Sequence, residues 1–277
     1  MNSIERNQHI GVFDSGFGGL TILQEIKHVL PEYSYIYLGD NARAPYGTRS
    51  FETVYKYTLE AVKKLFELDC SLIILACNTA SAKALRTIQQ QDLPKLAPNK
   101  RILGVIRPCS EQAGLFTQNN NLGIFATSGT VSSHSYEIEI QKFFPNISVT
   151  PHACPMWVPI VENGEALSEG ADYFVQKEIH ALLQKNNNID SILLACTHYP
   201  ILLPKIKKYL PSHISVINQG SIVAQSLKKY LLLHPEIESR CIRSGKIQYY
   251  TTEKAEIFNT IAECFTHSPI IAKTISL

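Results

Sequence analysis

The segments SLIILACNTA (residues 71–80) and SILLACTHYP (residues 191–200) follow one pattern. Each is an unbroken apolar run that ends on a cysteine and continues into small polar residues. Unbroken apolar runs of this length are typical of strands covered on both faces, as in parallel sheets. The pattern predicts that Cys77 and Cys196 lie at the ends of two buried strands.

Similar apolar runs recur along the chain, between longer segments of helical period. They are IGVF (10–13), YIYL (35–38), LIILA (72–76), ILGVI (102–106), LGIF (122–125), ISVT (147–150) and ILLA (192–195). Between the second and third run, the apolar residues of segment 51–66 fall on one stripe of a helix. Strand and helix signals that alternate in this way favour an α/β fold with mainly parallel sheets.

The two halves of the chain also match each other. IGVF and LGIF start 122 − 10 = 112 residues apart, and the two cysteines lie 196 − 77 = 119 residues apart. Each of the two matched strands is followed by small polar residues and glycine. We interpret this as an internal duplication that builds two similar α/β domains, related by a pseudo-twofold axis and facing each other across a cleft. One cysteine is then expected on each wall of the cleft.

Length and composition limit the classes of function. A chain of 277 residues with 45% hydrophobic content can form one large α/β domain or two modest ones, and the duplication favours two. The net charge of +2 is dispersed, which gives no sign of a nucleic-acid or membrane surface. The first ten residues include Glu5 and Arg6 and lack an apolar segment, so we expect a cytoplasmic protein. The seven cysteines show no paired CxxC spacing, which favours reduced thiols.

The glycine-rich segment DSGFGGLT (residues 14–21) follows the first predicted strand. Its glycine spacing does not fit the dinucleotide-binding fingerprint, and the segment has no GK[ST] signature of a phosphate-binding loop. Because ligands of parallel α/β sheets gather at the carboxyl ends of the strands, we expect the backbone here to cradle a carboxylate. Asp14, Cys77 and Cys196 all lie at such strand ends.

A cysteine at the end of a buried strand is usually an inert part of the core, but a matched pair is less easily explained in that way. One alternative is a metal site in which Cys196 and His198 share an ion with His152 and Cys154, although the spacing matches no common zinc motif. Another is a nucleophilic Cys–His pair, which gives no reason for the second cysteine.

Two thiols that face each other across a cleft are suited to proton transfer on both faces of one carbon. One thiolate removes a proton while the opposite thiol delivers one, which inverts the stereocentre. Asp14 beside Cys77 and His198 beside Cys196 are the candidate activating groups, because a free thiol is mostly protonated at neutral pH. Donors around the substrate carboxylate must lower the barrier further, and the candidates are Ser15, Asn78, Thr79 and Thr197. This scheme needs no electron sink, so we expect no cofactor, pyridoxal phosphate included, and no metal.

Six segments of the chain resemble bacterial glutamate racemases, cofactor-independent enzymes of the aspartate/glutamate racemase superfamily. They are GVFDSGFGGLT (11–21), ARAPYGTRS (42–50), ACNTAS (76–81), ACPMWVPIVENGE (153–165), ACTHYPIL (195–202) and YYTTEKAEIF (249–258), in the family order. The resemblance implies a first domain formed by both chain ends and a second formed by the middle. With crossing points placed near two proline-containing segments, we expect the first domain at residues 1–99 and 211–277 and the second at 100–210.

The resemblance also implies roles for individual residues. Cys77 and Cys196 would be the two proton donors and acceptors, with Asp14 assisting Cys77, and Glu162 and His198 assisting Cys196. The implied substrate-binding residues are Asp14, Ser15, Tyr46, Gly47, Asn78, Thr79, Thr197 and His198. Tyr46, Gly47 and Glu162 rest on the resemblance alone.

The implied reaction interconverts L-glutamate and D-glutamate, which supplies D-glutamate for the bacterial cell wall, and we expect a homodimer. Two other classes stay open: an aspartate racemase or related isomerase or decarboxylase, and a non-catalytic protein that binds an amino acid or a partner. Three positions depart from the usual family pattern: Arg107, Cys109 and Asn218.

Overall fold

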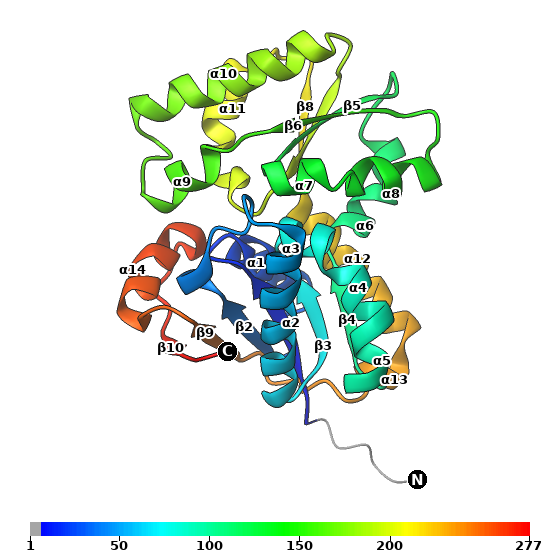
Figure 1. Cartoon of the computed structure of the whole chain (residues 1–277), viewed down its shortest axis with the longest axis vertical. Helices are drawn as coiled ribbons and strands as arrows, with labels where there is room; N and C mark the ends of the chain where they lie inside the picture. Colours follow the sequence, from blue (N-terminus) through cyan, green and yellow to red (C-terminus); the bar gives the residue numbers. More distant parts are fainter. Residues whose placement is uncertain (1–6) are drawn as a thin grey trace.

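The computed structural model describes residues 7–277, which form two α/β lobes, one above the other in Figure 1. In this part of the chain the first lobe contains a six-stranded sheet of order β10-β9-β2-β1-β3-β4, and the second a four-stranded sheet of order β6-β5-β7-β8. All paired strands run parallel. The predicted fold class is therefore confirmed.

The strands are short, as is usual for parallel sheets. Those of the first sheet are β1 (His9–Asp14), β2 (Tyr35–Gly39), β3 (Cys70–Leu75), β4 (Arg101–Gly104), β9 (Ile247–Thr251) and β10 (Ala272–Thr274). Those of the second sheet are β5 (Asn121–Ala126), β6 (Ser148–Ala153), β7 (Ser191–Ala195) and β8 (Ser215–Asn218).

The helices cover both faces of each sheet. The first lobe carries α1 (Gly19–Val29), α2 (Phe51–Glu67), α3 (Asn78–Lys83), α4 (Leu85–Thr87), α5 (Leu93–Leu96), α12 (Gln219–Leu233), α13 (Pro235–Glu238) and α14 (Ala255–Thr266). The second lobe carries α7 (Ser128–Ser132), α8 (Ser135–Phe143), α9 (Trp157–Glu162), α10 (Glu169–Lys185) and α11 (Leu203–Tyr209), and α6 (Ile106–Ser110) lies where the two lobes meet (Figure 1).

The two sheets repeat one strand order, β2-β1-β3-β4 in the first and β6-β5-β7-β8 in the second. The first strand of each half therefore lies between the second and third strands of that half. Because β3 and β7 occupy equivalent places, the cysteines that follow them are also equivalent. This topology agrees with the internal duplication inferred from the sequence.

Side chains of the central strands are buried on both faces, as the unbroken apolar runs predicted. Ile10 and Val12 of β1 join the core under α1 and α12, whereas Phe13 joins the core under α2. Helix α2 begins after Ser50, whose Oγ accepts a hydrogen bond from the N–H of Thr53 at 3.1 Å. Such an N-cap fixes where the helix starts and which face it presents to the sheet.

The chain passes from one sheet to the other at points shifted from the expected domain boundaries. Strand β4 pairs with β3 in the first sheet, and β8 pairs with β7 in the second. On sheet membership we propose that the crossings lie after Gly104 and after Asn218. The division into domains at residues 99 and 210 stays a prediction. Residues 1–6 of the chain, which include Glu5 and Arg6, lie outside the described part.

Two further observations concern the class of protein. None of the helices between residues 7 and 277 has the length and apolar character that crossing a membrane requires. The seven cysteines all lie within residues 7–277, and each of them except Cys264 is buried.

Candidate active site

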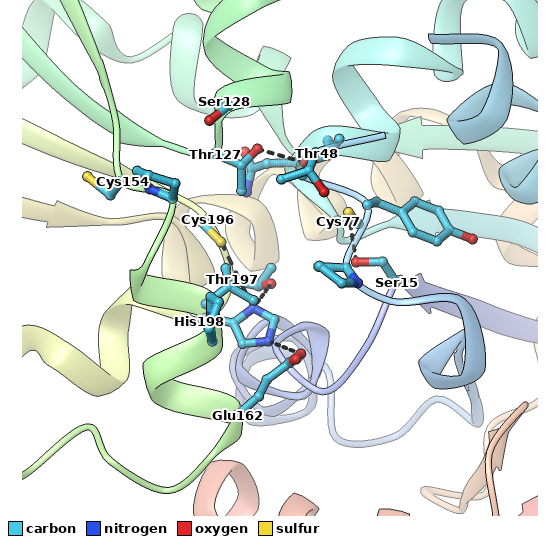
Figure 2. Close-up of a pocket in the computed structure, with 18 residues that line it drawn as sticks. Ser15, Thr48, Cys77, Thr127, Ser128, Cys154, Glu162, Cys196, Thr197 and His198 are labelled. Atoms are coloured by element: carbon cyan, nitrogen blue, oxygen red, sulfur yellow. Dashed lines mark hydrogen bonds and ion pairs between the residues drawn. The ribbon is translucent and has the colours of Figure 1, made fainter. Parts of the chain in front are cut away.

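A cavity lies between the lobes, at the carboxyl ends of the strands of both sheets (Figure 2). Cys77 reaches it from the first lobe and Cys196 from the second, and Figure 2 shows the two sulfur atoms on opposite sides of it. Ten residues assigned to the active site from the sequence line this cavity: Ser15, Tyr46, Gly47, Cys77, Asn78, Thr79, Glu162, Cys196, Thr197 and His198. Residues far apart in the sequence are thus brought to one site by the fold.

Cys77 lies between β3 and α3, where it is the N-cap residue of the helix. Its sulfur accepts a hydrogen bond from the N–H of Ala80 at 3.4 Å and shares another with the Ser15 hydroxyl at 3.3 Å. Burial raises the pKa of the Cys77 thiol to about 12, and the nearby charge of Asp14 adds to the increase, while both hydrogen bonds act against it. At neutral pH Cys77 is therefore a thiol that can donate a proton.

Cys196 follows β7 and has a different partner. The Nδ1 atom of His198 lies 3.9 Å from its sulfur, and the Nε2 atom of the same ring lies 2.9 Å from a carboxylate oxygen of Glu162. Burial acts to lower the pKa of His198, but the hydrogen bonds with Cys196 and Glu162 and their negative charges raise it to about 10. His198 is therefore an imidazolium at neutral pH, and its charge stabilises negative charge on the neighbouring sulfur.

Asp14, the last residue of β1, is fully buried but does not line the cavity. Its carboxylate accepts hydrogen bonds from the N–H of Gly16 and the hydroxyl of Thr197, each at 3.3 Å. Burial raises the pKa of Asp14 to about 6, although the positive charge of His198 opposes the increase. Direct substrate contact by Asp14, as expected from the sequence, thus finds no support in the lining. Its position outside the lining suits a group that acts on Cys77 through its charge rather than by contact with a ligand.

The glycine-rich turn after β1 serves to pack the lobes together. A Cβ at Gly18 would overlap Thr197 Oγ1 and lie 2.5 Å from Nδ1 of His198, both in the second lobe. A Cβ at Gly19 would lie 2.5 Å from the Cβ of Asp14. Of this turn only Ser15 lines the cavity. The expected backbone cradle for a substrate carboxylate is therefore not formed by these glycines.

Tyr46 and Gly47 reach the cavity from the segment before α2. The hydroxyl of Tyr46 donates a hydrogen bond to the buried carboxylate of Asp40, so its ring and backbone, rather than its hydroxyl, are left to face a ligand. The carbonyl of Gly47 accepts a hydrogen bond from the N–H of Gly129 at 2.8 Å. This bond ties the segment to α7 of the second lobe.

Sequence reasoning missed several residues that line the cavity: Pro45, Thr48, Thr127, Ser128, Pro155, Val158 and Pro159. Cys154 also lines it, although the sequence indicated this residue only for the alternative metal site. The duplication contained a signal for one of the missed residues. The offset between the first strands of the two halves makes Thr127 the counterpart of Ser15 in the duplication, since 127 − 15 = 112. Applied to the residues after each strand, this offset predicts that Thr127 reaches the cavity too.

The two histidines of the alternative metal site both have carboxylate partners in the structure. His152 Nε2 lies 2.6 Å from a carboxylate oxygen of Glu178, and both nitrogens of His198 face protein partners. Over residues 7–277 no three His, Cys, Asp or Glu side chains form a group that could hold a metal ion.

Comparison with known proteins gives the class of this chain. The family model Asp/Glu/Hydantoin racemase matches residues 20–227, and the chain belongs to this family. It is 38% identical to the glutamate racemase of Enterococcus faecalis over 94% of this chain and 92% of that protein, and 38% identical to the glutamate racemase of Bacillus cereus over 95% of each.

Solved structures agree with the sequence comparison. A glutamate racemase isoform of Bacillus anthracis superposes with a TM-score of 0.89 at 32% identity, with 99% of each chain covered. The glutamate racemase of Francisella tularensis, solved in complex with D-glutamate, superposes with a TM-score of 0.85 at 30% identity, with 98% of each chain covered. The resemblance noted in the sequence is therefore confirmed.

Proposed function

We propose that this protein is a glutamate racemase, an isomerase that interconverts L-glutamate and D-glutamate by a two-base mechanism. The observation that carries the proposal is the placement of Cys77 and Cys196 after equivalent strands, on opposite sides of one cavity. The similarity to glutamate racemases along nearly the whole chain supports the choice of substrate.

A two-base mechanism needs one cysteine to accept a proton while the other donates one. Cys196, beside the imidazolium of His198, acts as the thiolate that removes the α-proton from one face of the substrate. The electron pair of the broken C–H bond stays on the substrate as a carbanion. Cys77, a thiol at neutral pH, gives its proton to the opposite face and becomes the thiolate. In the reverse direction the two exchange roles.

Neighbouring groups support the two proton transfers. Glu162 holds His198 in place and in its charged form, while Asp14 and Ser15 act on Cys77. The α-proton of an amino acid is far less acidic than a thiol, so donors to the substrate carboxylate must stabilise the developing charge. We assign this task to Ser15, Asn78, Thr79 and Thr197, with Tyr46, Gly47 and His198 completing the substrate site.

The test of the function is incubation of purified protein with L-glutamate in deuterated water without added cofactor. The α-proton signal and the optical rotation are followed together. Loss of both establishes racemisation without an added cofactor. Retention of both would contradict the proposal, and preference for L-aspartate or an arylmalonate in the same assay would assign the chain to another activity of the superfamily. Glutamate binding with no exchange would indicate a non-catalytic protein.

We further infer that the enzyme acts in the cytoplasm as a homodimer and that its D-glutamate enters peptidoglycan. Size-exclusion chromatography with light scattering tests the dimer, and D-glutamate auxotrophy after deletion of the gene tests the role in the cell wall.

A further inference from the structure

Three buried side chains beside the cavity form a closed ring of hydrogen bonds. Nδ2 of Asn78 donates to Oε1 of Gln219 at 2.7 Å, Nε2 of Gln219 donates to the hydroxyl of Tyr136, and that hydroxyl donates to Oδ1 of Asn78 at 2.6 Å. Each of the three residues is at least 97% buried. Asn78 is the member of the ring that lines the cavity. Each member therefore uses both a donor and an acceptor inside the ring.

The ring joins parts of the molecule that are distant in the chain. Asn78 begins α3 of the first lobe, Tyr136 lies in α8 of the second, and Gln219 begins α12 at the crossing between the lobes. The ring is complete only when the lobes are together. A buried polar group that loses its partner carries a desolvation penalty, so the closed arrangement holds all three side chains in place.

The ring also determines what Asn78 presents to a ligand. A carboxamide nitrogen carries two N–H groups, and one of them is engaged by Gln219. In the described part of the chain Nδ2 has no second protein acceptor, whereas Oδ1 is occupied by Tyr136. The opposite sense of the ring would turn a lone pair of Asn78 towards the ligand, which an anionic carboxylate disfavours.

Cys109 adds a further contact to Gln219. Its sulfur lies 3.5 Å from Nε2 of Gln219, so both N–H groups of that carboxamide have acceptors. Burial raises the pKa of the Cys109 thiol to about 12, so it is uncharged at neutral pH. Cys109 departs from the usual family pattern, and it has a structural role here as a support for Gln219.

We propose that Tyr136 and Gln219 are positioning residues that hold the Asn78 carboxamide with one N–H directed at the substrate carboxylate. This inference rests on the proposed function for its substrate, but the ring itself belongs to the protein without substrate. Tyr136 and Gln219 do not line the cavity, so they act only through Asn78.

The test is a double-mutant cycle with L-glutamate and D-glutamate as substrates. Because a hydrogen bond to a charged group contributes about 1.5–3 kcal/mol, Asn78→Ala should lower kcat/KM about 10- to 100-fold. Tyr136→Phe should lower kcat/KM about tenfold by leaving the Asn78 N–H poorly aimed at the substrate carboxylate. The effect should fall mainly on KM, because this N–H binds the substrate and the transition state alike. In the Asn78→Ala background Tyr136→Phe should change kcat/KM less than about twofold, because nothing remains to be positioned.

Two further variants separate positioning from structural damage. Gln219→Met interrupts the ring at another member. Like Tyr136→Phe, it should lower kcat/KM in the wild-type background and have little effect in the Asn78→Ala background. Tyr35→Phe removes a different buried tyrosine hydroxyl, which donates to the carbonyl of Leu30 at 2.6 Å, and should leave kcat/KM unchanged. An equal loss from Tyr136→Phe in both backgrounds, or no loss in the wild-type background, would overturn the proposal.

A measurement without substrate keeps this inference separate from the proposed function. The side-chain amide signals of Asn78 in a ¹⁵N-labelled protein are identified by their loss in Asn78→Ala. Tyr136→Phe should shift them and speed their exchange with water, whereas Tyr35→Phe should not. If wild-type protein does not racemise glutamate, the proposed function fails, and unchanged Asn78 signals in Tyr136→Phe would separately refute the ring.

Discussion

His198 and Glu162 form an ion pair of 2.9 Å inside the cavity, although they come from different elements of the second lobe. The side chain of His198 is 4% exposed and that of Glu162 is 21% exposed, so the pair shields the imidazolium from solvent without sealing it off. Because the other ring nitrogen faces Cys196, a change at Glu162 is transmitted to the sulfur.

Glu162→Gln should therefore alter the pH dependence of the reaction. The Glu162 charge and hydrogen bond help to raise the pKa of His198 to about 10, so their removal lowers it and the imidazolium is lost at a lower pH. We expect kcat/KM to fall about tenfold and its alkaline limb to move towards neutral pH, as measured in a pH–rate profile. Glu178→Gln, which breaks the buried His152–Glu178 pair of the same lobe, should leave this limb in place. An unshifted limb in Glu162→Gln would contradict the assignment.

Replacement of either cysteine should prevent inversion. General acid–base groups contribute about 10²- to 10⁴-fold, so Cys77→Ser and Cys196→Ser should each lower the rate of racemisation by at least about 100-fold. Polarimetry measures the loss, and circular dichroism checks the fold. The exposed Cys264 provides the control, since Cys264→Ser should retain full activity. Wild-type turnover in either cavity variant would remove that cysteine from the mechanism.

Asp14→Asn should stabilise the protein while it impairs catalysis. The folded state raises the pKa of Asp14 to about 6, so this group favours folding below its ordinary pKa near 4 and that stabilisation is lost as pH rises through 6. Relative to wild type, the variant should melt several degrees higher at pH 7 and at the same temperature below pH 4. Thermal unfolding at a series of pH values measures the difference. An equal offset at all pH values would contradict this origin.

Gly18→Ala should damage the site by separating the lobes. The new Cβ would meet Thr197 and His198, which are themselves held by Asp14 and Glu162. Overpacking of a buried contact costs about 1–3 kcal/mol, so we expect a lower melting temperature and at least a tenfold loss of kcat/KM. Gly170→Ala, exposed in α10 with no neighbour of its Cβ closer than 3.6 Å, should keep wild-type activity. Wild-type activity in Gly18→Ala would contradict the prediction, because it would show that the contact between the lobes adjusts to the added Cβ.

Sequence patterns predicted the parts of the fold that are buried on both faces. The seven apolar runs located the strands from β1 to β7, and the helical stripe located α2, because burial requires apolar side chains at regular spacing. The strands β8, β9 and β10 were missed. They are short and partly exposed, with polar residues among the apolar ones, so their sequences resemble loops.

The candidate site was predictable where the duplication repeats. Cys77 and Cys196 stood out because two strand ends match, and His198 and Asp14 lie near those ends in the sequence. Glu162 and Tyr46 reach the cavity from a helix end and a connecting segment, and only the family resemblance indicated them. The ring through Tyr136 and Gln219 depends on contacts between lobes, which no local pattern specifies.

The repeated strand order has a consequence for how the enzyme treats its two mirror-image substrates. Two identical half-length chains about a twofold axis would offer both enantiomers the same chemistry. In the joined chain the two walls differ, with Asp14 and Ser15 behind one sulfur and His198 and Glu162 beside the other. Each enantiomer is therefore deprotonated by a cysteine with different neighbours, so the rate constants of the two directions can differ. The equilibrium still lies at equal amounts of the two enantiomers.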